Sequence, residues 1–389
     1  MDILDFILFP FYCFLFFYLV KYRLAKSTDP VLKIYYRNAF LIRIISCLSF
    51  SVFLVYISAG DSFGTYYAEA SNIFKQSLQD PSIIGRMIFT SAKNIESALF
   101  SIEGGGTAVF SDENNYMVVR VAAVFMFLSF GKYLIANLFF SMLAFEGSWR
   151  LYKFFYEQYP GMHKQFAFAI LYFPTFIFWS SGISKEAICI AGIGFITYGL
   201  YSIFVKRKNI LGSSLAVLLF TYLLSNVKIY ILASYLPFFI YFIVVSKVLT
   251  VKNTLLKIFL GPLIVALSTL AFISILISSK EELGAYAVEG LTQTIQQQQM
   301  NFMIQENISE SNFSLGTEFD GSFLGLVKLA PAAITASLFR PFLWEAKKLS
   351  TLLSSIESLA LMLLTLYTLY KAGPVNFMGY LFKKPIVTY

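Results

Sequence analysis

Charged residues stand at three places in this sequence where apolar runs begin, end or are interrupted. Asp61 follows Gly60 at the end of a long apolar run. Lys185 and Glu186 separate two further apolar runs, and Arg340 lies in the mostly apolar stretch Leu-Phe-Arg-Pro-Phe-Leu-Trp-Glu. A carboxylate can take a proton from a hydroxyl group or hold a cation, and a cationic side chain can stabilise an anion. These residues are candidates for one site, although charges at hairpin tips are also common in proteins that cross a membrane several times.

The composition places these residues in a membrane protein. Of the 389 residues, 58% are hydrophobic, 18% are aromatic and only 13% are charged. Ordinary soluble domains carry about 25% charged residues, and a soluble core could not hide this much apolar surface. The formal net charge is +8, but the basic residues are scattered between apolar runs, which argues against a nucleic-acid partner. The sequence predicts an all-α integral membrane protein with a single polytopic domain over residues 1–389.

Apolar runs of about 17–25 residues, enough to cross roughly 30 Å of hydrocarbon, predict about nine transmembrane helices. They cover residues 3–20, 39–59, 117–145, 165–180, 187–205, 210–227, 229–245, 258–278 and 349–370. The third run is long enough to be kinked or split at Gly131. Two long polar segments remain, residues 60–116 and residues 279–348, and the second includes an amphipathic stretch that we expect at the membrane interface.

Lysine and arginine residues divide unequally between the two predicted sides. The connections on one side carry 17 of them, in residues 21–38, 146–165, 206–209, 246–257 and 371–389. The short connections on the other side carry one each, Lys185 and Lys228. Positively charged short loops stay in the cytoplasm, whereas long loops cross largely regardless of charge. We therefore expect the N-terminus and both long loops outside and the C-terminus in the cytoplasm.

With this topology, the unusual charged residues gather near the outer ends of separate spans. They are Asp61, Arg120, Lys185, Glu186, Lys228, Arg340, Glu345 and Glu357. Acids and bases from several spans at a similar depth suggest a site between helices that opens outward. Arg43 and Lys132 depart from the pattern, and Arg43 is close enough to the cytoplasmic side for its head group to reach the surface.

Three short segments resemble a known family. Gly60-Asp61-Ser-Phe-Gly-Thr-Tyr66-Tyr67, directly after an outward-going span, resembles the first outer loop of bacterial polytopic glycosyltransferases of the GT-C type, which carry a carboxylate there. The segments Phe-Trp-Ser-Ser-Gly-Ile-Ser-Lys-Glu and Leu-Phe-Arg-Pro-Phe-Leu-Trp-Glu are similar to those of uncharacterised bacterial envelope-polysaccharide membrane proteins. The chain departs from the family in having one well-placed aspartate instead of paired acids, and no soluble outer domain after the last span.

The resemblance implies a sugar donor carried on a polyprenyl phosphate and used at the outer face of a bacterial inner membrane, in the synthesis of an envelope glycan. Asp61 would be the catalytic base, and Glu186 would orient Lys185 or bind the acceptor. The residues that would contact the substrate are Lys185, Arg340, Arg120, Tyr66, Trp179, Trp344 and Glu345. A divalent cation is a possible cofactor, although His163 is the only histidine and no Cys/His metal spacing exists.

Three other functions remain open. A polysaccharide polymerase would share the compartment and the lipid carrier, but such proteins use arginines in outer loops, and here these loops contain only Arg86 and Arg340. A transporter or flippase for a lipid-linked sugar would have broken helices and polar residues at the mid-plane of the membrane. A non-catalytic membrane component would leave the outer charges without a shared cavity.

Overall fold

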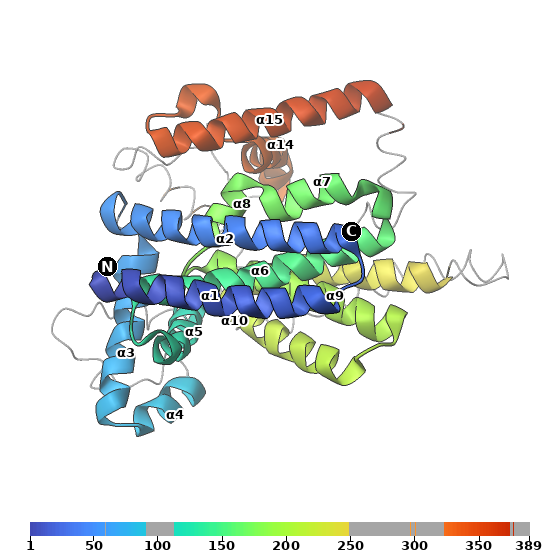
Figure 1. Cartoon of the computed structure of the whole chain (residues 1–389). Helices are drawn as coiled ribbons and strands as arrows, with labels where there is room; N and C mark the ends of the chain where they lie inside the picture. The colour runs from blue at the N-terminus through green and yellow to red at the C-terminus, as the bar shows by residue number, and fades with distance from the viewer. Residues whose placement is uncertain are drawn as a thin grey trace. The chain divides into compact units, whose positions relative to one another are not determined.

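The computed structural model describes residues 1–58, 60–90, 113–248, 296, 300, 323–373 and 376 (Figure 1). Within these ranges the regular structure is entirely helical. The chain divides into two units, Met1–Leu232 and Ala233–Tyr389, which are described separately. The predicted eighth span, residues 258–278, lies outside the described residues, as does most of the predicted outer loop 279–348.

The first unit contains a series of helices. In chain order they are α1 (Ile3–Lys26), α2 (Pro30–Tyr56), the π-helical η1 (Ser62–Tyr67), α3 (Ala68–Gln79), α4 (Ser82–Phe89), α5 (Glu113–Ser129), α6 (Tyr133–Gln158), the 3-10 turn η5 (Pro160–Met162), α7 (His163–Ala167), the π-helical η6 (Phe168–Tyr172), α8 (Pro174–Trp179), α9 (Lys185–Tyr201), the π-helical η7 (Ser202–Lys206) and α10 (Ile210–Val248), which continues into the second unit. The second unit also contains α14 (Phe323–Phe339), η9 (Leu343–Glu345) and α15 (Leu349–Ala372).

Aspartates begin the first two helices. Asp2 and Asp5 form a capping box at the start of α1. Asp29 accepts hydrogen bonds from two N–H groups in the first turn of α2, where Pro30 has no N–H to leave unpaired. Only residues 27–29 join the two helices. Both helices contact α6, and Figure 1 shows them beside it.

Five helical segments of the described chain are long and apolar enough to cross a membrane. They are α1, α2, α9 with η7 (Lys185–Lys206), the first part of α10 (Ile210–Leu236) and α15. An all-helical, multi-pass membrane protein is thus the architecture that the described residues support. The predicted number of nine spans is not confirmed.

The predicted third span, residues 117–145, is two helices instead of one. α5 and α6 are bent by 116° across a break that contains Phe130 and Gly131, both with positive φ values of 55° and 70°. Lys132 follows the break, and its Nζ lies 2.5 Å from a carboxylate oxygen of Asp2. The split at Gly131, which the length of the run predicted, places Lys132 beside the N-terminus of α1.

One other predicted span is interrupted, and a further break lies between two predicted spans. The fourth, residues 165–180, consists of α7, η6 and α8, and the backbone is extended at Phe173, before Pro174, because a residue preceding proline is disfavoured in the helical region. α10 covers both the sixth and the seventh predicted spans, and its backbone leaves helical geometry at Lys228 (φ −153°, ψ 75°), between those two runs.

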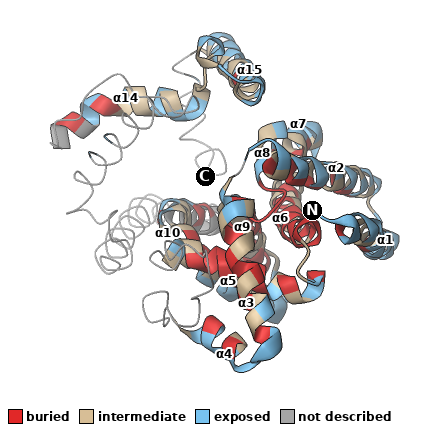
Figure 2. Cartoon of the chain, turned by 90° about the vertical axis from the view of Figure 1, so that its left-hand side faces the viewer, coloured by how far each residue is buried: buried red, intermediate tan, exposed pale blue. Residues whose placement is uncertain are grey.

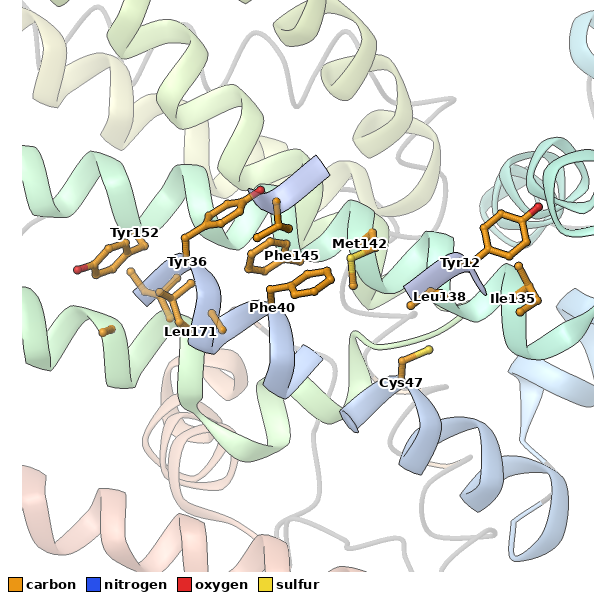
Figure 3. Packing of buried hydrophobic residues seen from close by; sticks show 14 residues of the cluster. Tyr12, Tyr36, Phe40, Cys47, Ile135, Leu138, Met142, Phe145, Tyr152 and Leu171 are labelled. Atoms are coloured by element: carbon orange, nitrogen blue, oxygen red, sulfur yellow. The ribbon is translucent and has the colours of Figure 1, made fainter. Parts of the chain in front are cut away.

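Helix α6 forms the centre of the first unit. Buried residues concentrate on α6 and α9, whereas α1 is largely exposed (Figure 2). Aromatic and aliphatic side chains of α1, α2 and α6 interdigitate along one side of α6, with Tyr36 and Phe40 packed against Phe145 (Figure 3). On another side of α6, Gly147 meets Gly194 of α9 so closely that a Cβ on Gly194 would lie 1.9 Å from the Gly147 oxygen.

Candidate functional site

Arg43, in the middle of α2, is the centre of a buried polar network. Only 3% of its surface is exposed. Nη1 donates hydrogen bonds to the Ile177 oxygen at 3.0 Å and to Ser180 Oγ at 2.5 Å, and Nη2 donates to Ser148 Oγ at 3.2 Å. Among the described residues, none of the carboxylates forms an ion pair with this guanidinium. The expectation that Arg43 reaches the cytoplasmic surface is wrong, because hydroxyl and carbonyl oxygens inside the helix bundle solvate its charge.

Asn137 of α6 contacts the segment that follows Ser180, at Ile183. Its Oδ1 accepts a hydrogen bond from Ile183 N at 2.9 Å, and its Nδ2 donates to Ser51 Oγ at 2.8 Å. Gly182 fits between Asn137 and Phe50, where a Cβ would lie 2.2 Å from the Phe50 ring. Only glycine fits at this position without a shift of α2 or α6.

The connection between α8 and α9 is therefore a buried, non-helical segment instead of a solvated loop. Residues 180–183 are buried, and Ser184 caps α9 by accepting a hydrogen bond from Ala187 N at 3.1 Å. Irregular backbone at membrane depth is tolerated where protein or an aqueous cavity surrounds it. Here Arg43 and Asn137 supply the polar partners.

Lys185 and Glu186 begin α9 directly after this buried segment. Glu186 is exposed, and one of its carboxylate oxygens lies 3.0 Å from Nζ of Lys228, at the break in α10. The resemblance implied that Glu186 would orient Lys185 or bind the acceptor; in the structure Glu186 forms an ion pair with Lys228. This pair connects the start of α9 to the break in α10 within the first unit.

Asp61 stands at the head of η1, just beyond the end of α2. Its side chain is exposed and forms no capping hydrogen bond with η1. The turn that follows is fixed by its neighbours: Ser62 Oγ lies 3.1 Å from Tyr133 OH, and Tyr67 OH donates to the Gly131 oxygen at 3.0 Å. π-helical turns occur frequently at functional sites. Asp61 therefore presents its carboxylate from a turn that is held against the α5–α6 break.

The aromatic candidates of the first unit differ in exposure. Tyr66 is buried, and its hydroxyl donates to Asn115 Oδ1 at 2.8 Å, so its ring packs inward. Trp179 is 42% exposed and packs edge-on against Phe50 and Phe53 of α2. Of these two, Trp179 has the more accessible ring for a ligand.

Arg120 has partners within its own part of the fold. It is buried on α5, where Nη1 lies 3.0 Å from a Glu113 carboxylate oxygen and Nη2 donates to the Thr90 oxygen. Its guanidinium also stacks over the Tyr116 ring at 4.2 Å from the centroid. These contacts join α5 to the end of α4, whereas Nε of the same guanidinium is buried without a hydrogen-bond partner among the described residues.

Arg340, Trp344 and Glu345 belong to the second unit. Arg340 Nε donates to Glu345 Oε1 at 2.8 Å, and Phe342 N donates to Glu345 Oε2 at 2.8 Å. Burial opposes ionisation of Glu345, but these hydrogen bonds outweigh it and lower the pKa of the carboxyl group. Trp344 is 79% exposed and stacks on Phe342. Arg340 and Asp61 belong to different units, so the predicted approach of these two residues stays a prediction.

Glu69, on α3, is an acid that the sequence analysis passed over. Only 5% of its surface is exposed, and burial raises its pKa, although a hydrogen bond with Asn72 acts in the opposite direction. A carboxyl group with a raised pKa is the type that can act as a general acid. Its position eight residues after Asp61 was visible in the sequence, but its burial was not.

The opposite ends of the first unit differ in chemical character. One end carries Asp61, the Asp2–Lys132 ion pair and the start of α9. At the other end, Arg23 of α1 pairs with Glu146 of α6, and Lys206 of η7 pairs with Glu157. The basic connections at residues 21–38, 146–165 and 206–209 therefore lie at one end of the unit, as the alternation of spans requires.

Among the described residues, no group of three or more histidine, cysteine, aspartate or glutamate side chains is arranged to hold a metal ion. No protein-family model, curated protein or solved structure matches this chain.

Proposed function

We propose that this chain is a membrane glycosyltransferase that uses a lipid-linked sugar at the outer face of a bacterial inner membrane. The observation that carries the proposal is the position of Asp61. Its exposed carboxylate caps no helix, and it stands at the end of the first unit opposite the basic connections. A carboxylate at that interface can take a proton from a hydroxyl group while the lipid tail of a donor stays in the bilayer.

In the proposed reaction, an acceptor hydroxyl oxygen forms a bond to the anomeric carbon of the sugar. The bond from that carbon to the phosphate oxygen breaks, and polyprenyl phosphate leaves with the bonding electrons. Asp61 takes the hydroxyl proton. Lys185 would stabilise the departing phosphate, since a cationic group aimed at developing negative charge lowers the barrier.

The test is release of polyprenyl phosphate by the full chain in lipid nanodiscs, with a panel of polyprenyl-phosphate sugars as donors and a panel of sugar hydroxyl acceptors. Asp61→Asn keeps the shape but removes the base, so the rate should fall about 10²-fold or more. Asp80→Asn is the matched control, because Asp80 is an exposed aspartate of the same predicted outer segment. Its Oδ1 accepts a hydrogen bond from Ser82 N at 2.9 Å. Equal rates for Asp61→Asn and wild type would remove Asp61 from the site.

A transporter of lipid-linked sugars is the second candidate, and the buried network around Arg43 favours it. Transporter sites commonly combine broken helices with polar groups inside the membrane. Here the α8–α9 segment is unwound and meets Arg43 and Asn137 in the interior. The same nanodisc preparation, reconstituted into vesicles, separates the two functions: a transporter moves the labelled lipid between leaflets without releasing polyprenyl phosphate.

A further inference from the structure

A cavity of about 270 Å³ opens at the basic end of the first unit. It lies between the end of α1, the start of α2, the second half of α6 and Tyr198 of α9. Its charged walls are Arg23, Glu146, Arg150 and Lys153, and its aromatic walls include Tyr36 and Trp149. From the sequence, the basic residues of this region were expected only to orient the chain in the membrane. No binding site was predicted here.

The charges of the cavity are unbalanced. Glu146 already pairs with Arg23 and with Arg150, and it accepts a hydrogen bond from Tyr36 OH at 2.6 Å. Three cationic side chains and one carboxylate line the cavity, which leaves two positive charges uncompensated within it. An anion is the ligand that such a wall would bind.

Lys153 is the most available of the three cations. Its nearest carboxylate, on Glu157, lies 3.9 Å away. That carboxylate is already engaged by Lys206 Nζ at 2.8 Å and by Tyr198 OH at 3.1 Å. A ligand oxygen in the cavity could therefore take the Lys153 ammonium without breaking a short ion pair.

We propose that this cavity binds the phosphate-bearing headgroup of a lipid. Arginine and lysine side chains together suit a phosphate group, and the Trp149 ring provides an apolar wall beside it. The cavity is slightly smaller than the roughly 300–1,000 Å³ of pockets for whole drug-sized ligands, so it suits a headgroup better than a nucleotide sugar. The turns of α1 that lead to Arg23 expose Tyr18, Leu19 and Tyr22, which offer an apolar surface to the lipid chains.

The proposed lipid site does not depend on the glycosyltransferase proposal. It is at the end of the first unit opposite Asp61, and its residues play no part in the proposed transfer. A lipid bound here would sit at the cytoplasmic interface in the predicted topology, where anionic lipids attract basic residues.

The tryptophans provide a direct measurement of binding. Of the three in the chain, Trp149 is in the cavity, and replacing Trp179 and Trp344 by phenylalanine leaves it as the sole reporter. We expect its fluorescence to change saturably when dioctanoyl phosphatidic acid is added to this full chain in detergent micelles, but not when dioctanoyl phosphatidylcholine is added. Lys153→Gln should weaken the phosphatidic acid affinity about tenfold, because a charge-assisted hydrogen bond to the phosphate is lost.

Lys164→Gln is the matched control. It removes one positive charge from the same end of the unit, but Lys164 is exposed on α7 and does not line the cavity. Equal weakening by Lys153→Gln and Lys164→Gln would show general attraction by a basic surface and overturn the site. Inorganic phosphate or uridine monophosphate that displaced the lipid at equal concentration would assign the cavity to a soluble anion and overturn the lipid headgroup.

Discussion

Arg43 and its serine partners show how a charge can be retained inside an apolar bundle. The guanidinium donates to Ser180, Ser181 and Ser148 and to one backbone oxygen, which together replace the water it has lost. The cost of burying a charge is large unless it is hydrogen-bonded on several sides. The network therefore also fixes the Ser-Ser-Gly segment at one position relative to α2 and α6.

Replacing Arg43 by alanine should destabilise the protein by about 3 kcal/mol or more, because several charge-assisted hydrogen bonds are lost and buried hydroxyl groups remain. Arg37→Ala is the matched control on the same helix. Arg37 is exposed and makes one long hydrogen bond, of 3.4 Å, to its neighbour Asn38. Thermal unfolding in detergent compares the two variants. An Arg43→Ala variant as stable as Arg37→Ala would show that the network does not hold the segment.

The sequence predicted the break at Ser-Ser-Gly but not its burial. Arg43 is 137 residues away from Ser180, and nothing in the local pattern indicates which span faces the break. Asp61 could be predicted as a candidate from the local sequence alone, because a glycine and an aspartate directly follow an apolar run. Its recognition does not require knowledge of a residue that contacts it in the fold. The Glu186–Lys228 pair could not be predicted, because it depends on where the break in α10 meets the start of α9.

At the scale of helices, α6 and α9 pack closely at two glycines. Among the glycines described in the first unit, a Cβ added at Gly194 would have the shortest distance to a neighbouring atom. A Cβ on Gly147 would lie 2.4 Å from the Ala191 Cα, and one on Gly194 would lie 1.9 Å from the Gly147 oxygen. Small residues let transmembrane helices approach with their backbones in contact. The sequence contains the signal, Ala191-Gly192-Ile-Gly194, but it does not say that Gly147 is the opposite residue.

Gly194→Ala should force α6 and α9 apart and lower stability by about 1–3 kcal/mol or more, as overpacking does in tightly packed cores. Gly85→Ala on α4 is the control, because a Cβ there meets nothing within 4 Å. That change should be neutral or stabilising by about 0.5–1 kcal/mol, since alanine loses less backbone entropy on folding. Melting temperatures of the two variants in detergent test this contrast, and an unchanged temperature for Gly194→Ala would contradict the close packing.

Helix periodicity and length predicted which runs are helical better than they predicted which runs are continuous. The α5–α6 break lies in a long apolar run, whose length and Gly131 predicted a kink or split, but not that Phe130 would also adopt a positive φ value. Similarly, η6 and α8 divide a run that by composition alone is one span. Apolar composition reports compatibility with lipid, but it does not report where tertiary contacts stabilise a turn.

At the scale of the whole molecule, the two ends of the first unit differ chemically, and this difference decides which end faces which side of the membrane. The end with Asp61 is assigned to the outside, and the end with Arg23, Arg150 and Lys206 is assigned to the cytoplasm. The assignment comes from the uneven distribution of lysine and arginine over the connections. Both the proposed transfer at Asp61 and the cytoplasmic position of the lipid site follow from it.

Labelling of introduced cysteines with a membrane-impermeant maleimide in intact cells tests this assignment most directly. Ser82→Cys places an exposed thiol in the predicted outer segment, and Lys208→Cys places one at the basic end. The parent chain, whose own cysteines lie in apolar helices, is the blank. We expect Ser82→Cys to react in intact cells and Lys208→Cys to react only after permeabilisation; the reverse pattern would place Asp61 in the cytoplasm and contradict the account.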